Sequence, residues 1–456
     1  MKFLAKLLLS AAIVSTAGIA TGCDLFAEKI SAYDIAVSNG FVGTEEEWLQ
    51  SLKGADGKDA ENLDFYDAYL AAVENAGYEG DFISFLQTYF SADVQEDNDV
   101  VQLAHNTMSV VSVYAGFTTT TQGFMGQGTK KAYSSAGSGV IVDLDKENGN
   151  ATIITNYHVI YDSNADSQIS DSIYLYLYGA INAYSTQTNR DEGGDGMKAK
   201  FIGGSMDYDV AVLEIEGSDV LKESAAEEAV LGDSDNVDIG EKVFAIGNPE
   251  GAGISITDGV LSVDSEYIYM TSSDGGRNVR YRVMRTDAAI NHGNSGGALF
   301  NAKGELIGIT NAKSTAEDVD NMGYALPINQ VKAVAENALA NDGTVKRAKM
   351  GVEILVTDSA VSVDESTGMI VEETVSIASH VTDSTAAAYG KLQKDDVIKA
   401  LRIGDGETLP ITRLFHLSDA LLQIRVGDTV TFTVVRGGKE ETVQMKFTAK
   451  DFTVIA

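Results

Sequence analysis

The chain has 456 residues and carries 33 basic against 67 acidic side chains, a net charge of −34. This length exceeds what one compact core usually holds and predicts two or three domains. The negative charge repels phosphate backbones and disfavours nucleic-acid binding, whereas the apolar content of 44% is that of an ordinary globular protein.

The N-terminal residues have the pattern of an export signal. Lys2 and Lys6 precede the apolar residues 7–20, and small residues follow. A charged start, a short apolar stretch and a small-residue cleavage site are typical of a signal peptide, predicted here as residues 1–22. No later stretch is long and apolar enough to predict a transmembrane helix. We therefore expect an exported protein whose body is soluble.

The single cysteine, Cys23, follows directly after this signal. An exported chain with one cysteine forms no internal disulfide. The stretch "IATGC" resembles a bacterial lipobox, in which the cysteine is acylated and becomes the mature N-terminus, although Ala20 stands where leucine is usual. We expect lipidation of Cys23 and a lipoprotein held at the cell membrane. The alternatives are a secreted soluble protein released by ordinary signal peptidase, and a thiol without a role.

Residues 32–52 and 68–89 form an internal repeat. In each copy an apolar helical pattern ends at an Asn/Gly turn, and a second helix begins at a good N-cap residue. The matched pairs are Tyr33 and Tyr69, Val37 and Val73, Phe41 and Tyr78, and Trp48 and Phe85. Each copy predicts a small helical hairpin, and the first also resembles a short module of Gram-positive surface proteins. We expect residues 23–98 to be a helical spacer or docking module, joined to the rest by an acidic linker at residues 92–99.

From about residue 100 to 326, short β-branched runs alternate with Gly, Asn and Asp turns. Short strands at this spacing predict an all-β barrel or sandwich. A helical pattern begins at residue 328. The last hundred residues return to strands, with one amphipathic helix over residues 414–424 and a hairpin turn at residues 436–438. The predicted fold class is mostly β.

The stretch "NHGNSGGALF" places Ser295 among glycines, where a serine could be a nucleophile. A serine hydroxyl needs a neighbouring base to take its proton. His158 follows the apolar strand pattern of residues 151–155 and is the best candidate. The other histidines are His105, His292, His380 and His416. Two of them lie on amphipathic helical patterns, one has no visible partner, and His292 is too close in sequence to fold back onto Ser295.

A carboxylate must also fix the histidine tautomer and stabilise the imidazolium. Asp209 opens the apolar strand pattern "DVAVLEI" and is the first choice. Asp207, two residues earlier, is the alternative. The order along the chain is then His, Asp, Ser, an arrangement that places His158 and Asp209 in one β-barrel and Ser295 in a second.

The whole set of motifs resembles the trypsin-like serine proteases and, more closely, the HtrA/Deg family. The motifs are "GSGVI" (137–141), "TNYHV" (155–159), "DVAVL" (209–213), "AIGNP" (245–249) and the stretch 286–299. The resemblance covers roughly residues 100–450. It implies a trypsin-like double β-barrel with the catalytic residues His158, Asp209 and Ser295. Tyr157 departs from the family pattern, and residues 161–200 form a long polar insertion near the rim of the active site.

The residues around Ser295 carry further expectations. The backbone N–H groups of Gly293 and Ser295, with Asn294 between them, are expected to form the oxyanion hole. Asn294 lacks the carboxylate that digestive relatives pair with a newly cut N-terminus, so activation by clipping is not expected. Ala289 and Ile290 are expected to form a shallow apolar substrate pocket that favours cleavage after small aliphatic residues.

The C-terminal segments resemble one PDZ domain. In that resemblance the amides of Met350, Gly351 and Val352 capture a peptide C-terminus, and the following strand pairs with the peptide. Lys394 stands where the family pattern has glycine, and a β-rich domain that only packs is the alternative. The predicted division is a signal peptide (1–22), the helical module (23–98), a trypsin-like protease domain (99–342) and a PDZ domain (343–456).

The predicted function is that of an ATP-independent serine endopeptidase that degrades misfolded exported proteins at the cell surface. Its expected partners are unfolded or misassembled proteins and their C-termini, and the membrane through Cys23. The resemblance also implies a homotrimer. No cofactor and no metal are expected, because no His/Cys ligand cluster exists. The alternatives are a chaperone or binding scaffold built on a protease fold, and an adhesion protein in which residues 24–98 carry the function.

Overall fold

The computed structural model describes residues 95–122, 128–180, 195–311, 322–364 and 368–455. The signal peptide, Cys23 and both copies of the repeat lie outside these residues. Residues 98–456 form one compact unit, which contains all the predicted site residues of the protease and PDZ segments. Among the residues described, no helix is both long and apolar enough to cross a membrane.

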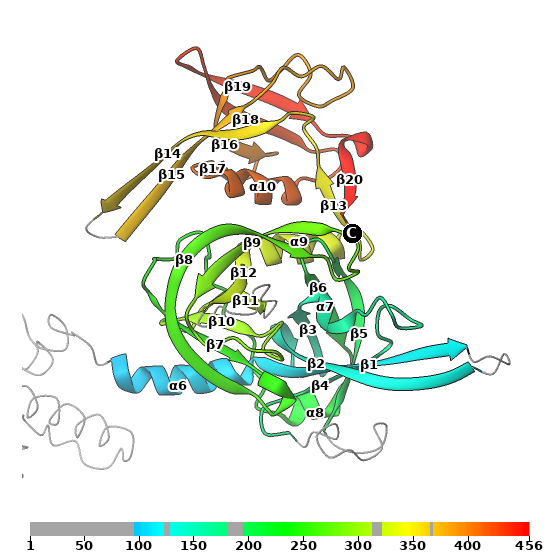
Figure 1. Ribbon diagram of the computed structural model, residues 1–456. Helices are drawn as coiled ribbons and strands as arrows, with labels where there is room; N and C mark the ends of the chain where they lie inside the picture. Colours follow the sequence, from blue (N-terminus) through cyan, green and yellow to red (C-terminus); the bar gives the residue numbers. More distant parts are fainter. Residues whose placement is uncertain (1–94, 123–127, 181–194, 312–321, 365–367, 456) are drawn as a thin grey trace, which may run out of the picture. The chain divides into compact units, whose positions relative to one another are not determined.

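The first half of this unit folds into a closed β-barrel (Figure 1). Its strands are β1 (Val110–Gln122), β2 (Gly128–Asp145), β3 (Asn150–Thr155), β4 (Ser172–Tyr176), β5 (Met197–Ser205) and β6 (Val210–Ile215). They pair in the order β1-β2-β3-β6-β5-β4. Alternate residues of β1, namely Val111, Val113 and Ala115, are fully buried in the barrel core, as the period of two along a strand requires.

A second closed barrel follows. Its strands are β7 (Lys242–Gly247), β8 (Ser255–Thr271), β9 (Asn278–Thr286), β10 (Ala298–Asn301), β11 (Leu306–Asn311) and β12 (Gly323–Pro327). They pair in the order β10-β11-β12-β9-β8-β7 around a core that includes Val243, Leu299 and Ile307. The predicted trypsin-like double β-barrel is therefore confirmed.

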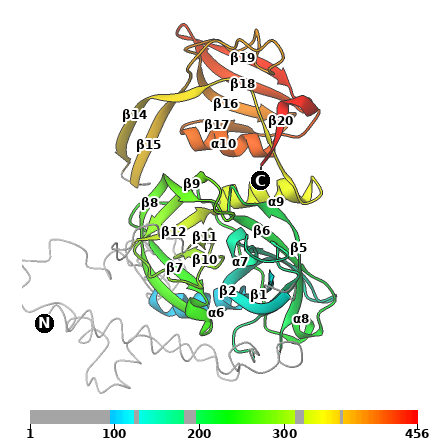
Figure 2. The same cartoon turned by 45° about the vertical axis from the view of Figure 1, so that its right-hand side comes forward.

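A separate apolar cluster joins the two barrels. Val110 and Val212 of the first barrel share it with Phe300 and Ile309 of the second. The helix α9 (Ile328–Leu339) adds Val331 and other apolar residues to the same cluster, and Figures 1 and 2 both show α9 against the strands. Strands at this junction thus bury one face inside their own barrel and the opposite face between the two barrels.

Short elements connect the strands. They are α6 (Gln95–Met108), α7 (Tyr157–Ile160), α8 (Asp219–Glu223) and η1 (Pro249–Gly251). Two expectations need correction here. The predicted acidic linker at residues 92–99 is helical from Gln95 onward, because α6 packs Leu103 against the inter-barrel cluster. Residues 161–200 are not one polar insertion, because they contain β4 and the start of β5, whose apolar side chains fill the first barrel.

The C-terminal residues form a smaller β-sheet with one helix. The elements are β13 (Val345–Ala348), β14 (Ile354–Asp364), β15 (Gly368–Ile377), β16 (Val397–Ile403), β17 (Thr408–Pro410), α10 (Leu414–Gln423), β18 (Thr429–Arg436), β19 (Lys439–Lys446), η2 (Ala449–Asp451) and β20 (Phe452–Ile455). The sheet order is β14-β15-β16-β18-β19, with β17 beside β16, so β14 lies at an edge. Its own core includes Leu401, Leu421 and Phe432. The predicted helix and hairpin turn are confirmed.

A buried arginine links α10 to the second barrel. Arg282 of β9 has a side chain only 1% exposed, and its Nη1 lies 2.5 Å from Asp419 Oδ2 on α10. Its Nη2 lies 2.8 Å from Asp235 Oδ1, and its guanidinium stacks 3.4 Å from the centroid of the Phe415 ring. Burial raises the pKa of Asp419 to about 6, against the opposing effect of Arg282. The charge of Arg282 is therefore balanced by Asp235 of the protease segment and by Asp419 of α10.

Candidate active site

His158 and Asp209 meet at the end of the first barrel. The strand β3 ends at Thr155, and the single turn α7 then carries His158 toward the residue that precedes β6. His158 Nδ1 lies 2.7 Å from Asp209 Oδ2, and the backbone N–H of His158 donates to Asp209 Oδ1 at 2.9 Å. The aspartate is completely buried, whereas the histidine side chain is 20% exposed. A carboxylate at Nδ1 leaves Nε2 as the ring nitrogen that can accept a proton.

Two asparagines hold Asp209 in place. Asn311, at the end of β11 in the second barrel, donates from Nδ2 to Asp209 Oδ2 at 2.9 Å. Asn156 donates to the Asp209 carbonyl at 2.9 Å. These bonds support a backbone φ of 53° at Asp209, which is uncommon for a residue other than glycine. Sequence reasoning missed both asparagines, although each is a polar residue at the end of an apolar strand pattern.

The alternative carboxylate does not approach His158. Asp207 pairs with Arg277, whose Nη2 lies 2.5 Å from Asp207 Oδ1, and burial raises the pKa of Asp207. Two of the other histidines also have different surroundings. His105 pairs with Glu227 at 2.8 Å, and His416 lies on α10, where burial lowers its pKa.

Ser295 lies in the loop between β9 and β10, beside the segment that carries His158. Its backbone carbonyl accepts a hydrogen bond from the N–H of Ser138 on β2 at 2.8 Å. The next residue, Gly296, has φ +83°, and a Cβ there would lie 2.2 Å from Thr155 Oγ1 and 3.0 Å from the Asn156 nitrogen. Only glycine fits this close approach between the two barrels. The "NSGG" pattern therefore brings the serine, at 6% exposure, against the turn that precedes His158.

The predicted oxyanion-hole residues differ in what their N–H groups contact. Gly293 has φ +93°, and a Cβ there would lie 2.2 Å from the Asn248 carbonyl, so glycine is required at this position as well. The N–H of Asn294 donates to the Asn291 carbonyl at 3.0 Å. Of the three predicted residues, Asn294 therefore has its donor already engaged within the loop.

The two residues predicted to form the substrate pocket differ in exposure. Ala289 is exposed, and its carbonyl accepts hydrogen bonds from Thr257 Oγ1 at 3.0 Å and Asn294 Nδ2 at 3.3 Å. Ile290 is half-buried and lies close to Gly323, because a Cβ added at Gly323 would lie 2.7 Å from Ile290 Cδ1. The apolar character expected at this site remains a prediction.

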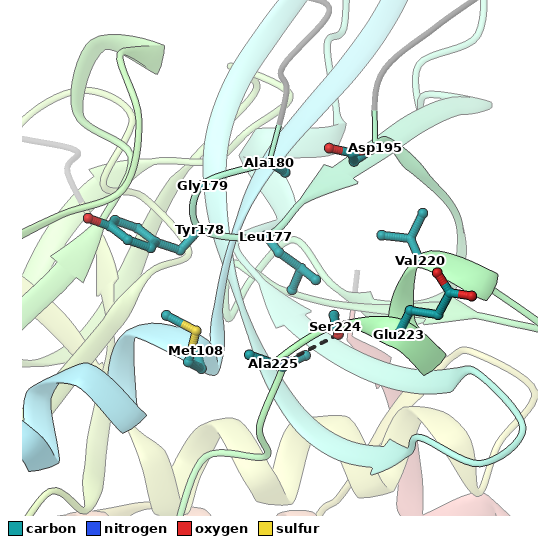
Figure 3. A pocket seen from close by; sticks show the side chains of 11 residues that line it. Met108, Leu177, Tyr178, Gly179, Ala180, Asp195, Val220, Glu223, Ser224 and Ala225 are labelled. Carbon is teal, nitrogen blue, oxygen red and sulfur yellow. Dashed lines mark hydrogen bonds between the residues drawn. The ribbon is translucent and has the colours of Figure 1, made fainter.

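A surface pocket of about 370 Å³ lies elsewhere on the molecule (Figure 3). Its walls come from Met108 at the end of α6, the residues after β4, Asp195, and α8 with the residues that follow it. None of His158, Asp209 and Ser295 lines it. In the part of the chain that the structure describes, no group of three or more His, Cys, Asp or Glu side chains could hold a metal ion.

Comparison with known proteins gives the family of this site. A model of the trypsin-like peptidase domain matches residues 137–309. The chain is 34% identical over 325 residues to the serine protease Do-like HtrA of Bacillus subtilis, covering 70% of this chain and 64% of that protein. It is also 34% identical over 324 residues to the serine protease Do-like HtrA of Lactococcus lactis subsp. lactis, covering 69% of this chain and 70% of that protein.

The chain belongs to the HtrA family of trypsin-like serine proteases. A further relative is the periplasmic serine endoprotease DegP of Escherichia coli, 31% identical over 333 residues, with 71% of this chain and 59% of DegP covered. This HtrA chain thus spans slightly less than two thirds of the Bacillus subtilis protein and a smaller share of DegP.

The residues predicted to bind a peptide C-terminus lie where this HtrA chain enters its C-terminal sheet. Met350 is buried, and its carbonyl accepts the Ala388 N–H at 3.1 Å. Gly351 has φ +80°, and a Cβ there would meet Ala386 at 2.3 Å. Val352 is half-buried against the core of this sheet and is followed by the edge strand β14.

Proposed function

We propose that this HtrA chain hydrolyses peptide bonds in misfolded exported proteins without ATP, with His158, Asp209 and Ser295 as its catalytic residues. The observation that carries the proposal is the hydrogen bond of 2.7 Å between His158 Nδ1 and the fully buried carboxylate of Asp209. It orients a histidine beside the loop of Ser295, as serine protease chemistry requires. The identity to named serine proteases supports the same reaction.

In this mechanism His158 acts first as a base and then as an acid. Nε2 removes the proton of Ser295 Oγ while the oxygen attacks the scissile carbonyl carbon, and the imidazolium that forms is stabilised by the Asp209 carboxylate. His158 then gives the proton to the leaving amine, and the acyl group stays on Ser295. A water molecule, deprotonated by His158, attacks this ester and restores the free serine.

The negative charge of the tetrahedral intermediate falls on the former carbonyl oxygen. We assign the N–H groups of Gly293 and Ser295 as its donors, because the N–H of Asn294 donates to Asn291. Losing one such donor typically costs about 10²–10³ in kcat. The substrate pocket is assigned to Ala289 and Ile290, with small aliphatic residues preferred at the cleaved bond.

A PDZ role is proposed for the C-terminal sheet. The open edge of β14 supports the addition of a peptide strand, and the loop of Met350, Gly351 and Val352 precedes that strand. Exposed C-termini of unfolded proteins would then bind beside α10, which contacts the second barrel through Asp419 and Arg282. Binding there supplies a physical route by which a substrate tail could change the protease.

Localisation at the cell envelope is proposed from two observations. The N-terminal pattern favours export with lipidation at Cys23, and one relative is named as a periplasmic endoprotease. A secreted soluble form is the alternative. A homotrimer is proposed from the family resemblance alone.

The test compares wild type with Ser295→Ala on unfolded casein, measuring both degradation and aggregation. The proposal predicts that only the wild type produces peptides. If both proteins degrade casein equally, Ser295 is not the nucleophile. If neither degrades it and both suppress aggregation, the chaperone alternative replaces the proposed function.

A further inference from the structure

Two peptide groups in the serine loop carry the N–H donors assigned to the oxyanion hole. They are the peptide between His292 and Gly293 and the peptide between Asn294 and Ser295. In a planar trans peptide the C=O and N–H bonds point in opposite directions. A partner that holds the carbonyl on one side therefore aims the N–H to the other side.

The first of these carbonyls is held by a neighbouring turn. The His292 carbonyl accepts the backbone N–H of Glu250 at 2.7 Å. Glu250 lies in η1 with φ 55° and ψ 14°, a left-handed conformation that a residue other than glycine seldom adopts. The two segments are in close contact, since a Cβ at Gly293 would lie 2.8 Å from the Glu250 nitrogen.

The second carbonyl is held by a buried side chain. The Asn294 carbonyl accepts Thr310 Oγ1 at 2.6 Å and the Gly297 N–H at 2.8 Å. Thr310 lies on β11 with no exposed surface, one residue before Asn311, which bonds to Asp209. One strand end thus contacts both the carboxylate of the candidate triad and the serine loop.

A third contact ties the turn and the loop together. Ser138 Oγ donates to the Gly293 carbonyl at 2.7 Å and accepts the Asn248 N–H at 2.8 Å. Ser138 is completely buried on β2 of the first barrel, and Asn248 directly precedes η1. The same hydroxyl therefore fixes the distance between the Glu250 turn and the loop that contains both donor peptides.

We propose that Thr310 and Ser138 are positioning residues for the oxyanion hole. Thr310 holds the Asn294 carbonyl and so aims the Ser295 N–H. Ser138 bonds to the Gly293 carbonyl and to Asn248, and so keeps the Glu250 turn, which holds the His292 carbonyl, against the serine loop. This inference rests on the proposed function, since it takes Ser295 as the nucleophile. Neither hydroxyl touches the substrate. Each is a buried donor to a backbone carbonyl of the serine loop, so removing it loosens a peptide group that carries an oxyanion donor or adjoins one.

The variant that tests this is Thr310→Val, which keeps the shape of the side chain and removes the hydroxyl. We expect kcat on a fluorogenic peptide to fall about tenfold to a hundredfold, because the Asn294 carbonyl then keeps the Gly297 N–H but loses its side-chain donor, and the Asn294–Ser295 peptide is held less firmly. KM should change less than about twofold, since ground-state contacts remain. Thr310→Ser, which restores the hydroxyl, should recover most of kcat, and Ser138→Ala should resemble Thr310→Val.

The matched control is Thr107→Val. Thr107 is also a buried threonine, and its Oγ1 donates to the Leu103 carbonyl at 2.6 Å, but it lies in α6 away from the serine loop. It should keep the wild-type kcat. A peptide aldehyde forms an adduct with Ser295 that places an oxygen in the oxyanion hole. Affinity for this aldehyde should fall together with kcat in Thr310→Val and stay unchanged in the control.

Three outcomes would overturn the inference. They are a Thr310→Val variant with kcat within twofold of wild type, a loss confined to KM, and a Thr310→Ser variant as impaired as Thr310→Val. Thr310→Val and Thr310→Ser should have equal melting temperatures, so that a difference in kcat between them reports positioning of the serine loop and not general instability. Failure of the proposed function has a different signature, in which Ser295→Ala itself retains activity.

Discussion

Replacement of Asp209 by Asn tests whether the buried carboxylate sets the histidine tautomer. Asp209 accepts three hydrogen bonds through its side chain, from the ring Nδ1 and the backbone N–H of His158 and from Asn311 Nδ2. An amide has one accepting oxygen and one donating nitrogen. If the oxygen stays with the His158 backbone, the amide NH₂ faces the ring, and His158 must present Nδ1 as an acceptor with its proton on Nε2.

That tautomer cannot take the proton of Ser295. We therefore expect kcat to fall about 10⁴-fold near neutral pH, which corresponds to about 5.4 kcal/mol of transition-state stabilisation. The assay is hydrolysis of a fluorogenic peptide, with wild type and variants compared at equal protein concentration. Asp207→Asn is the control, because that carboxylate pairs with Arg277 and should leave kcat within about threefold. An Asp209→Asn variant with more than a tenth of the wild-type kcat would show that the Asp209 carboxylate does not set the histidine tautomer.

Three further results are expected. Arg282→Met leaves the carboxylates of Asp419 and Asp235 without their cation, so it should lower the free energy of unfolding in urea by about 3–5 kcal/mol. An unchanged urea midpoint would contradict a structural role for this cluster. Burial, with Asp238 as the second cause, raises the pKa of Glu241 from 4.5 to about 7. The folded protein therefore holds this proton more tightly than the unfolded chain, so the free energy of unfolding declines as the pH rises from about 4.5 through 7, and Glu241→Gln should flatten that decline. A panel of fluorogenic peptides should show cleavage after Val or Ala in preference to Arg or Lys, and the reverse order would contradict the assignment of Ala289 and Ile290.

The parts of the fold that the sequence predicted are those that local patterns specify. Short strand patterns and glycine turns predicted a barrel or sandwich, and the resemblance to trypsin-like proteases narrowed this to the double barrel. The order His, Asp, Ser along the chain predicted the pairing of His158 with Asp209, which lies beside the Ser295 loop. The glycines around Ser295 were informative because each occupies a position where a side chain would collide with backbone.

What the sequence did not predict depends on contacts between distant strands. Asn311 and Thr310 reach the site only because the second barrel closes and brings the end of β11 against Asp209 and the serine loop. Nothing local distinguishes them from other polar residues at strand ends. The strand β4 was missed because it is short, Ser172–Tyr176, and follows residues 162–171, which are rich in Asp, Ser, Asn and Gln.

The most direct test of Ser295 as the nucleophile is to label the protein with a fluorophosphonate and locate the modified residue by peptide mass mapping. We expect one adduct, on Ser295, formed by the wild type and lost in His158→Ala, in parallel with loss of casein degradation. An adduct on another serine, or full labelling of Ser295 without His158, would contradict the assignment of this site.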